Sequence, residues 1–450
     1  MLKPKLKTRQ YFKTHNILKL VMFYITSILI GTILLHWDIF LKQGKNVSWL
    51  DAFFMSNSSI ATTGLTVVDY TTTYNYFGWI VMIVLFNIGG VGIILFNTMI
   101  ILLFGGKLNF KSSNMARLDY NQSNAIDLSY IVKNVIKYFL IIEVVGTIIL
   151  YIRMGDLLAD PLDRLMNALF LSSSGISGSG FYDSTIINGD YIAMWTCSAL
   201  MIFSFIGYPV ILDLKGYIHA KKSGVRYRFS TFTKISLIVN VVTTLAFAFF
   251  FIMLEFNNAM AGYGWFEKIN AGMYMSLSTK SVGLNLFKDI NTWLPLTLFI
   301  QSIFMLIGGA PSSACGGIKT NAIYIFWRYL KSLFKGQDDV IIYNRKVPDK
   351  TVKLSLVLIL LFISISGIVT MIISCINPEI NIANIWYDVV SGFTTTGFST
   401  GALAQFDQFS VFLMAILMGV GRIGVLNILM MLNKNNEKNH IHYVECGIAI

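Results

Sequence analysis

A turn centred on a glycine recurs four times in this chain, about every 110 residues, which is far longer than the repeat of a solenoid. The copies are Thr62-Thr63-Gly64-Leu65, Gly178-Ser179-Gly180-Phe181, Ser281-Val282-Gly283-Leu284 and Thr395-Thr396-Gly397-Phe398. Thirteen positions before each central glycine, counted from 64 back to 51 in the first copy, stands a predicted helix N-cap: Asp51, Asn167, Asn270 and Asn384. Each copy is therefore expected to be a whole supersecondary unit. Four glycine loops that meet around one axis predict a pore.

The composition places these loops in a membrane. The 450 residues are 55% hydrophobic and only 13% charged, about half the charge share of a soluble domain. Apolar runs of about 20 residues, long enough to span a bilayer, recur along the chain. Because helices satisfy their own backbone groups in lipid, the expected fold class is an all-α polytopic membrane protein. The first apolar run lacks a small-residue cleavage site, so we expect it to be a span rather than a signal peptide.

The net charge of +12 is unevenly distributed between the predicted loops. With an alternating topology, basic residues dominate the side that holds both termini, and acidic residues outnumber them on the other side. Cytoplasmic loops carry an excess of Lys and Arg, so both termini are predicted to be cytoplasmic. This distribution argues against nucleic acid as a partner and favours anionic membrane lipid or an acidic partner surface. The four cysteines show no paired spacing, which argues against a disulfide framework or a zinc site.

Each unit is predicted to contain a span, a half-helix too short to cross, the glycine loop and a second span. Eight transmembrane helices and four re-entrant loops around one pore follow from this order. The half-helices are expected at residues 49–61, 162–174, 266–278 and 385–393. The predicted boundaries are a cytoplasmic tail at 1–16, repeat 1 at 17–104, repeat 2 at 131–214, repeat 3 with a broken last helix at 232–330, repeat 4 at 351–432, and a second cytoplasmic tail at 433–450.

Ion permeation explains why these residue types recur. An alkali cation that enters a membrane must exchange its water shell for oxygens, and backbone carbonyls supply them without adding net charge. Glycine lets carbonyls converge on an axis because it has no side chain and adopts positive φ. A half-helix precedes every loop, so the negative end of its dipole is expected to face the loop. A single such turn would more often be a packing point, but four equivalent turns favour a pore.

One glycine-rich segment interrupts the last span of the third unit. Its residues are Gly308, Gly309, Ala310, Pro311, Ser312, Ser313, Ala314, Cys315, Gly316 and Gly317. Small residues with a proline and four glycines cannot continue a helix. A kink or a close helix crossing is one interpretation. The other is an unwound segment beneath the glycine loops that obstructs the pore until it moves.

Charged side chains at membrane depth are costly and mark paired or functional positions. Arg422 falls within the predicted final span, and Glu143 in the second unit is either its partner or part of a local hydrogen bond between helices. Lys319 directly follows the glycine-rich segment. Lys280, three residues before Gly283, is expected either to tune the outer mouth or to anchor its loop.

The order of span, half-helix, glycine loop and span, repeated four times, resembles the Trk/Ktr/HKT superfamily of potassium transporters over nearly the whole chain. Eight spans without extra N-terminal helices, together with Gly421-Arg422-Ile423-Gly424, are most similar to the bacterial Ktr membrane subunits. The resemblance implies no enzymatic activity. Relatives that favour Na+ often carry serine in place of the first glycine, so Gly64 points to K+. The second loop departs from the usual pattern, because Gly175-Ile-Ser-Gly-Ser-Gly180 lacks the usual asparagine.

The resemblance also implies roles for particular residues. The K+ selectivity filter would comprise Thr62, Thr63, Gly64, Gly178, Ser179, Gly180, Ser281, Val282, Gly283, Thr395, Thr396 and Gly397. Residues 308–317 would be the gating loop, and Arg422 would lie in the pore below the filter, near this loop. The resemblance further implies a homodimer in a bacterial cell membrane and a cytoplasmic RCK regulatory ring of the KtrA/KtrC type. That ring would bind the nucleotide, K+ would be the transported ion, and Na+ would be a candidate activator.

Two alternatives stay open. Na+ permeation or mixed K+/Na+ permeation would use the same loops. A secondary transporter of an organic solute would instead need convergent charged or aromatic groups at mid-depth, with broken helices around the site. The sequence places Glu143 and Arg422 as the charges at that depth, and four units of one topology favour a pore.

Overall fold

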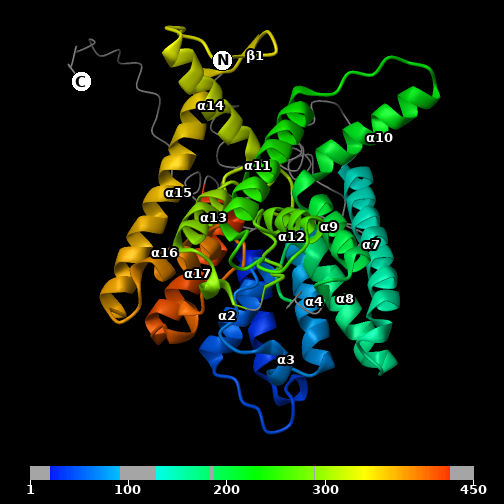
Figure 1. Cartoon of the computed structure of the whole chain (residues 1–450), viewed down its shortest axis with the longest axis vertical. Helices are drawn as coiled ribbons and strands as arrows, with labels where there is room; N and C mark the ends of the chain where they lie inside the picture. Colours follow the sequence, from blue (N-terminus) through cyan, green and yellow to red (C-terminus); the bar gives the residue numbers. More distant parts are fainter. Residues whose placement is uncertain (1–20, 92–127, 183–186, 288, 426–450) are drawn as a thin grey trace, which may run out of the picture.

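The computed structural model describes residues 21–91, 128–182, 187–287 and 289–425, and they are mostly helical (Figure 1). The helices of the first two units are Val21–His36, α2 (Trp49–Ile60), α3 (Tyr70–Thr73), α4 (Tyr76–Val91), α7 (Leu128–Arg153), α8 (Pro161–Ser177), α9 (Tyr191–Ile206) and α10 (Tyr208–Lys222). Those of the last two are α11 (Thr231–Glu255), α12 (Trp265–Ser278), α13 (Pro295–Leu306), α14 (Thr320–Phe334), α15 (Asp349–Ile376), α16 (Ile382–Phe393) and α17 (Gln408–Ile423). Short 3₁₀ turns occupy Asp38–Phe40, Met154–Asp156, Ile290–Thr292 and Ala402–Gln405, and β1 (Ile341–Ile342) pairs antiparallel with β2 (Arg345–Lys346).

A short helix precedes each glycine loop, as predicted, but the predicted N-caps are wrong. The helices α2, α8, α12 and α16 are capped by Ser48, Asp160, Gly264 and Asn381. Asp51, Asn167, Asn270 and Asn384 lie inside the helices, one or two turns beyond these caps. The reason is that a better local start lies upstream. In α2, for example, the Ser48 hydroxyl accepts a hydrogen bond from the Asp51 N–H (3.1 Å), so Asp51 belongs to the first turn.

Long apolar helices support a multi-pass membrane protein. Among the described residues, three helices are long and apolar enough to cross a bilayer: 134–156 within α7 and its 3₁₀ extension, α11, and α15. The pair α9 and α10 would add a fourth if the two are taken as one bent span. Shorter apolar helices at Val21–His36, α4, α13 and α17 lie within repeats 1, 3 and 4, where further spans are predicted. The eight-span count therefore stays a prediction, and residues 1–20, 92–127 and 426–450 of the predicted boundaries lie outside the described part of the chain.

Two predicted spans are interrupted at a glycine with positive φ. The second span predicted for repeat 2, which was expected to end at residue 214, bends by 102° between α9 and α10. Gly207 adopts a positive φ of 81° at the bend, and Pro209 in the first turn of α10 lacks the N–H that would continue α9. In the last predicted span, α17 ends at Ile423 because Gly424 has a positive φ of 88°, and the chain is helical again at Val425. The remainder of this span, up to residue 432, lies outside the described residues. Arg422 lies in the last turn of α17, directly before this break.

The four units close into a ring. In units two to four, the first long helix packs on its own short helix, as α7 does on α8, α11 on α12 and α15 on α16. Between units, α4 packs on α8, α9 on α12, and α13 on α16. The circle is closed by α17 of the last unit, which packs on α2 of the first (Figure 1). Each short helix is therefore packed between helices of its own unit and of the preceding unit. This arrangement brings the starts of the four glycine loops close together.

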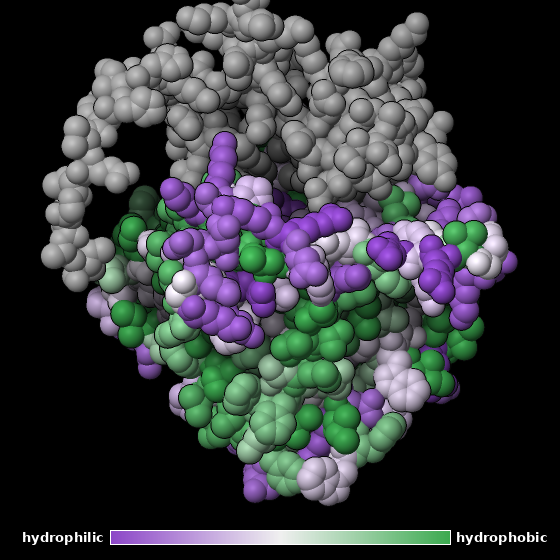
Figure 2. Space-filling model, turned by 90° about the horizontal axis from the view of Figure 1, so that it is seen from above, coloured by the Kyte–Doolittle hydropathy of each residue, from purple (hydrophilic) through white to green (hydrophobic). Residues whose placement is uncertain are grey.

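The end of the molecule that carries α10, α14 and the hairpin is hydrophilic (Figures 1 and 2). Exposed basic residues at this end include Lys221, Lys222, Arg226, Arg228, Lys335, Arg345, Lys346 and Lys350. Figure 2 also shows hydrophobic side chains beside this hydrophilic region. Basic residues gathered at one end agree with the uneven charge distribution in the sequence.

Candidate functional site

The four short helices all aim their C-termini at the glycine loops. They end at Ile60, Ser177, Ser278 and Phe393, three to five residues before Gly64, Gly180, Gly283 and Gly397. The partial negative charge of a helix C-terminus therefore faces each loop. In each loop, the residue before the central glycine donates a backbone hydrogen bond to a carbonyl in the preceding short helix. The N–H of Ser179 donates to the Ser174 carbonyl (2.9 Å), and the N–H groups of Thr63 and Thr396 donate to Ser58 and Ser391 in the same way.

The four central glycines form a closed ring, called here the glycine ring. A Cβ added to Gly64 would lie closer than 3.0 Å to the Ser179 carbonyl oxygen of the second loop. The same clash would occur between Gly180 and Val282, between Gly283 and Thr396, and between Gly397 and Thr63. In each loop, the central glycine thus packs against the backbone carbonyl of the residue that stands just before the central glycine of the next loop. No side chain larger than hydrogen fits at these four positions without moving backbone.

The loops also share an unusual backbone. All four central glycines have positive φ, between 68° and 99°. The residue two positions earlier does too, with φ of 53° at Thr62, 69° at Gly178, 62° at Ser281 and 52° at Thr395. Positive φ is disfavoured for residues with a Cβ and persists where the surroundings enforce it. Three non-glycine residues in this conformation at equivalent sites therefore point to a function of the loop shape rather than to local preference.

The 308–317 loop lies against the glycine loops on the side where the short helices end. It connects α13 to α14, and its ends meet, because the Gly308 N–H donates to the Ile318 carbonyl (3.0 Å). A Cβ added to Gly316 would lie closer than 3.0 Å to the Thr395 hydroxyl and the Thr394 carbonyl. The Cys315 thiol donates to the Lys280 carbonyl (3.0 Å). The segment predicted to interrupt a helix does so, directly beside the third and fourth glycine loops.

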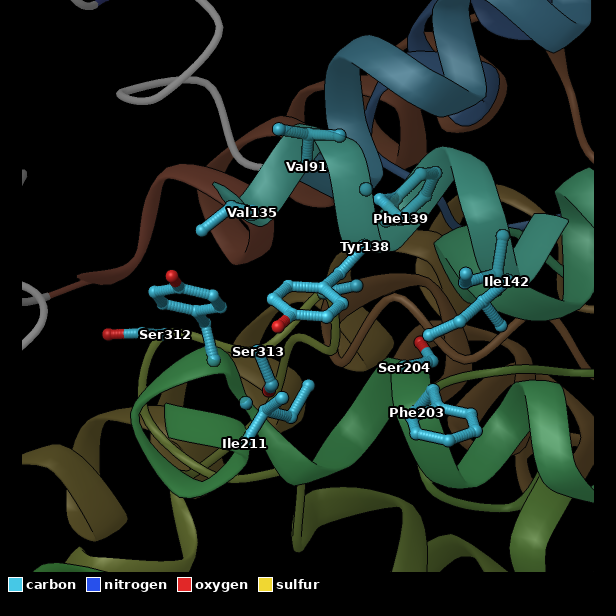
Figure 3. A pocket seen from close by; sticks show the side chains of 15 residues that line it. Val91, Val135, Tyr138, Phe139, Ile142, Phe203, Ser204, Ile211, Ser312 and Ser313 are labelled. Atoms are coloured by element: carbon cyan, nitrogen blue, oxygen red, sulfur yellow. The ribbon is translucent and has the colours of Figure 1, made fainter. Parts of the chain in front are cut away.

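The bend between α9 and α10 provides the acceptors that hold this loop. The last carbonyls of an α-helix have no partners within the helix. At the end of α9, the Phe205 carbonyl accepts from the Ala310 N–H (2.9 Å) and the Ser204 carbonyl from the Ala314 N–H (3.0 Å). On its flank, the loop borders a cavity lined by α7, α9 and α10, with Ser312 and Ser313 on one wall (Figure 3).

Comparison with known proteins identifies the family of this fold. Residues 3–442 match the TrkH family, described as cation transport proteins. The chain belongs to the TrkH family. It is 29% identical over 435 residues to Ktr system potassium uptake protein D of Bacillus subtilis (strain 168), covering 96% of each chain. It is 26% identical to Ktr system potassium uptake protein B of Vibrio alginolyticus, covering 95% of this chain and 93% of that protein.

A third relative and a solved structure extend the comparison. Potassium/sodium uptake protein NtpJ of Enterococcus hirae is 23% identical over 437 residues, covering 94% of each chain. The crystal structure of the potassium transporter TrkH from Vibrio parahaemolyticus aligns with a TM-score of 0.68 at 17% identity, over 96% of this chain and 86% of that one. This structural similarity shows the fold. The named relatives are transport proteins rather than enzymes, as the sequence predicted.

In this TrkH family chain, Arg422 links the 308–317 loop to the first unit. Its Nη1 donates to the Ala314 carbonyl and its Nη2 to the Gly89 carbonyl in α4. The proximity to the loop that the resemblance implied is therefore present. Lys319 donates from Nζ to the carbonyl of Cys315 and so braces the loop from its own end.

The partners of Glu143 and Lys280 resolve two alternatives. The Glu143 carboxylate accepts a hydrogen bond from Asn87 Nδ2 in α4 (3.3 Å), which is the local bond between helices rather than a pair with Arg422. Lys280 is buried, and its Nζ donates to the Asn240 carbonyl (2.8 Å) and to Thr243 Oγ1 (2.6 Å) in α11. It anchors its loop to α11 and does not face an outer mouth.

The structure buries more charged side chains than the sequence predicts. The described residues also bury Glu255, Lys268 and Asp388. Asp388, in α16, accepts four hydrogen bonds from the segment after the fourth glycine loop. The donors are Ser399 Oγ (2.7 Å), Thr400 N (2.8 Å), Thr400 Oγ1 (3.1 Å) and Leu403 N (3.1 Å). A lone aspartate in the apolar run 385–393 was the available signal.

Asp388→Asn is expected to destabilise the fold, because an amide nitrogen would face donors that need an acceptor. Leaving a buried donor unpaired costs about 1–3 kcal/mol. The measurement is thermal unfolding of the purified protein in detergent. Asp407→Asn is the matched control, because exposed Asp407 caps α17 and asparagine caps as well as aspartate. Equal unfolding midpoints for the two variants would remove Asp388 from the support of the fourth loop.

Proposed function

We propose that this chain is the ion-translocating subunit of a K+ uptake system, in which dehydrated K+ passes through the glycine ring. The observation that carries the proposal is the closed contact of each glycine with the carbonyl of the next loop. The proposed ligands are the backbone carbonyls of Thr63, Ser179, Val282 and Thr396. Four helix C-termini that face the loops add negative potential without a carboxylate that would trap the ion.

The names of the relatives support K+ as the main ion. Two are potassium uptake proteins, and the Enterococcus hirae relative is a potassium/sodium uptake protein. Mixed K+/Na+ permeation is therefore the second candidate. Glycine at position 64 favours K+, since the resemblance associates serine there with Na+. An organic-solute site is not favoured, because the charged side chains of Arg422, Lys280 and Asp388 are each bonded to backbone or neighbouring side chains.

Gly64→Ser is expected to lower the ratio of rubidium to sodium uptake by roughly tenfold, equivalent to about 1.4 kcal/mol. A Cβ at Gly64 must displace the Ser179 carbonyl, which disturbs the spacing of oxygens around a K+-sized ion. Gly401→Ser is the control, because Gly401 has a similar φ of 83° but no described atom within 4 Å of an added Cβ. An unchanged ion preference in Gly64→Ser would exclude Gly64 from the filter.

The 308–317 loop is proposed as the gate. It lies directly beside the Thr394–Thr395 backbone, its flank borders the cavity of Figure 3, and hydrogen bonds to helix ends hold it in place. Its movement is proposed to depend on a cytoplasmic RCK ring that binds the nucleotide, with Na+ as a candidate activator. A homodimer in the bacterial cell membrane, eight spans and two cytoplasmic termini complete the proposal.

Growth rescue tests this function. The chain is expressed, with and without a co-expressed RCK ring subunit, in a bacterium that lacks its own K+ uptake systems. We expect growth at low K+ and rubidium uptake that is larger with the ring. Normal membrane insertion without any rubidium uptake, with every ring subunit tried, would contradict the proposal and favour the organic-solute alternative.

A further inference from the structure

One buried hydroxyl joins the 308–317 loop to two of the glycine loops. Ser281 lies two residues before Gly283 and is fully buried. Its Oγ accepts a hydrogen bond from the Gly316 N–H (2.8 Å). The same Oγ donates to the Thr395 carbonyl (2.7 Å) and lies 3.1 Å from Thr395 Oγ1. Ser281 therefore contacts the third loop, the fourth loop and the 308–317 loop at one point.

This contact distinguishes the third loop from its counterparts. In the first loop the equivalent residue is Thr62, whose buried Oγ1 has no hydrogen-bond partner among the described residues. In the second it is Gly178, which has no side chain. In the fourth it is Thr395, whose Oγ1 lies against Ser281 itself. The bridge occurs where Gly316 of the 308–317 loop packs on Thr395, so its position coincides with the loop that is proposed to move.

We propose that Ser281 is a positioning residue that makes closure of the 308–317 loop oppose cation binding at the Thr395 carbonyl, which adjoins the proposed ligand Thr396 and which the resemblance includes in the selectivity filter. This rests on the proposed function. A serine hydroxyl has one proton, and donating it to Thr395 occupies one of the two lone pairs of that carbonyl. A donor at Gly316 polarises the hydroxyl and strengthens this bond. The seated loop thus reduces the capacity of the Thr395 carbonyl to bind a cation.

The coupling has a consequence in the other direction. If a seated loop weakens cation binding at Thr395, a bound cation must weaken the seating of the loop by the same factor. K+ arriving in the filter is therefore expected to favour release of the loop. Bound K+ would therefore promote opening of the 308–317 loop, in addition to any effect of a cytoplasmic partner.

Cys315 provides a probe that does not depend on transport. Its thiol is buried in the seated loop, next to Gly316. Alkylation by N-ethylmaleimide is followed by mass spectrometry on the purified chain in detergent, in K+ or in N-methyl-D-glucamine at equal ionic strength. Exposed Cys375 serves as the internal reference. We expect K+ to speed alkylation of Cys315. In Ser281→Ala the rate in the absence of K+ should rise about two- to tenfold, the effect of losing one hydrogen bond, and should no longer respond to K+.

Two variants separate coupling from general damage. Ser281→Thr keeps the hydroxyl and should behave like the wild type, because Thr62 and Thr395 already adopt this positive φ. Ser355→Ala makes the same chemical change in α15, where the hydroxyl donates to the Thr351 carbonyl of its own helix, and should leave the rates unchanged.

The failure of this inference and of the proposed function can be told apart. Wild-type Cys315 that is alkylated equally fast with and without K+ would overturn the coupling, even if Ser281→Ala does not fold. Ser281→Ala that keeps the wild-type rates would overturn it too. A wild type that inserts but takes up no rubidium would instead contradict the proposed function, whatever the alkylation rates.

Discussion

Deleting residues 311–315 is expected to raise rubidium uptake without the ring subunit by roughly tenfold or more, since a minor open state is commonly populated at 10% or less. The deletion removes Ala314, which Ser204 and Arg422 hold, and leaves Ala310, which bonds to Phe205. The remaining ends already meet, because Gly308 bonds to Ile318 and packs on Gly316. The chain can therefore close the shorter connection between α13 and α14 with little rearrangement.

The added uptake of the deletion variant is expected to pass through the glycine ring and not through a leak elsewhere in the protein. Uptake by the deletion variant should respond less to the ring subunit than uptake by the wild type. Gly283→Ala added to the deletion should lower its uptake by the same factor, about tenfold or more, as it does in the wild type, which excludes a leak elsewhere. A deletion variant that folds and inserts but takes up less rubidium than the wild type would count against a gating role for the 308–317 loop.

Gly283→Ala is expected to reduce rubidium uptake by at least about tenfold. An added Cβ would collide with the Thr396 carbonyl and approach Gly397, so the backbone of the fourth loop must move. Overpacking of this kind costs about 1–3 kcal/mol, and positive φ adds about 1–2 kcal/mol for a residue with a Cβ. The readout is initial uptake per amount of protein inserted in the membrane.

Gly262→Ala controls for backbone strain alone. Gly262 has a positive φ of 86°, close to the 75° of Gly283, but an added Cβ meets no described atom within 4 Å. This variant should insert and transport like the wild type. If Gly283→Ala also transports normally, the third loop does not coordinate the ion.

The recurrence of glycine in the sequence predicts the glycine ring. It does not predict which residues contact one another around the ring. A short helix, a glycine turn and a further helix recur at the four predicted places because each step has a local sequence cause. The break at residues 308–317 was predictable for the same reason, since proline and four glycines end a helix. The contact of Gly64 with the second loop depends on residues more than a hundred positions away, which no local pattern encodes.

Local competition explains the predictions that were wrong. The N-caps were placed too late because Asp51 and Asn384 are good caps in isolation, but Ser48 and Asn381 start their helices one turn earlier. The bend at Gly207 was missed because apolar residues continue through it. Asp388 was missed because its four donors follow it by 11 to 15 residues and meet it only after the fourth loop folds back.

The most direct test of the central claim is the position of a bound rubidium ion. Crystals of the wild-type protein grown in rubidium chloride would be measured by anomalous diffraction, in which rubidium scatters strongly. We expect an anomalous peak on the axis of the glycine ring, among the carbonyls of Thr63, Ser179, Val282 and Thr396. A protein that takes up rubidium but shows its peak away from this ring would contradict the four-loop filter.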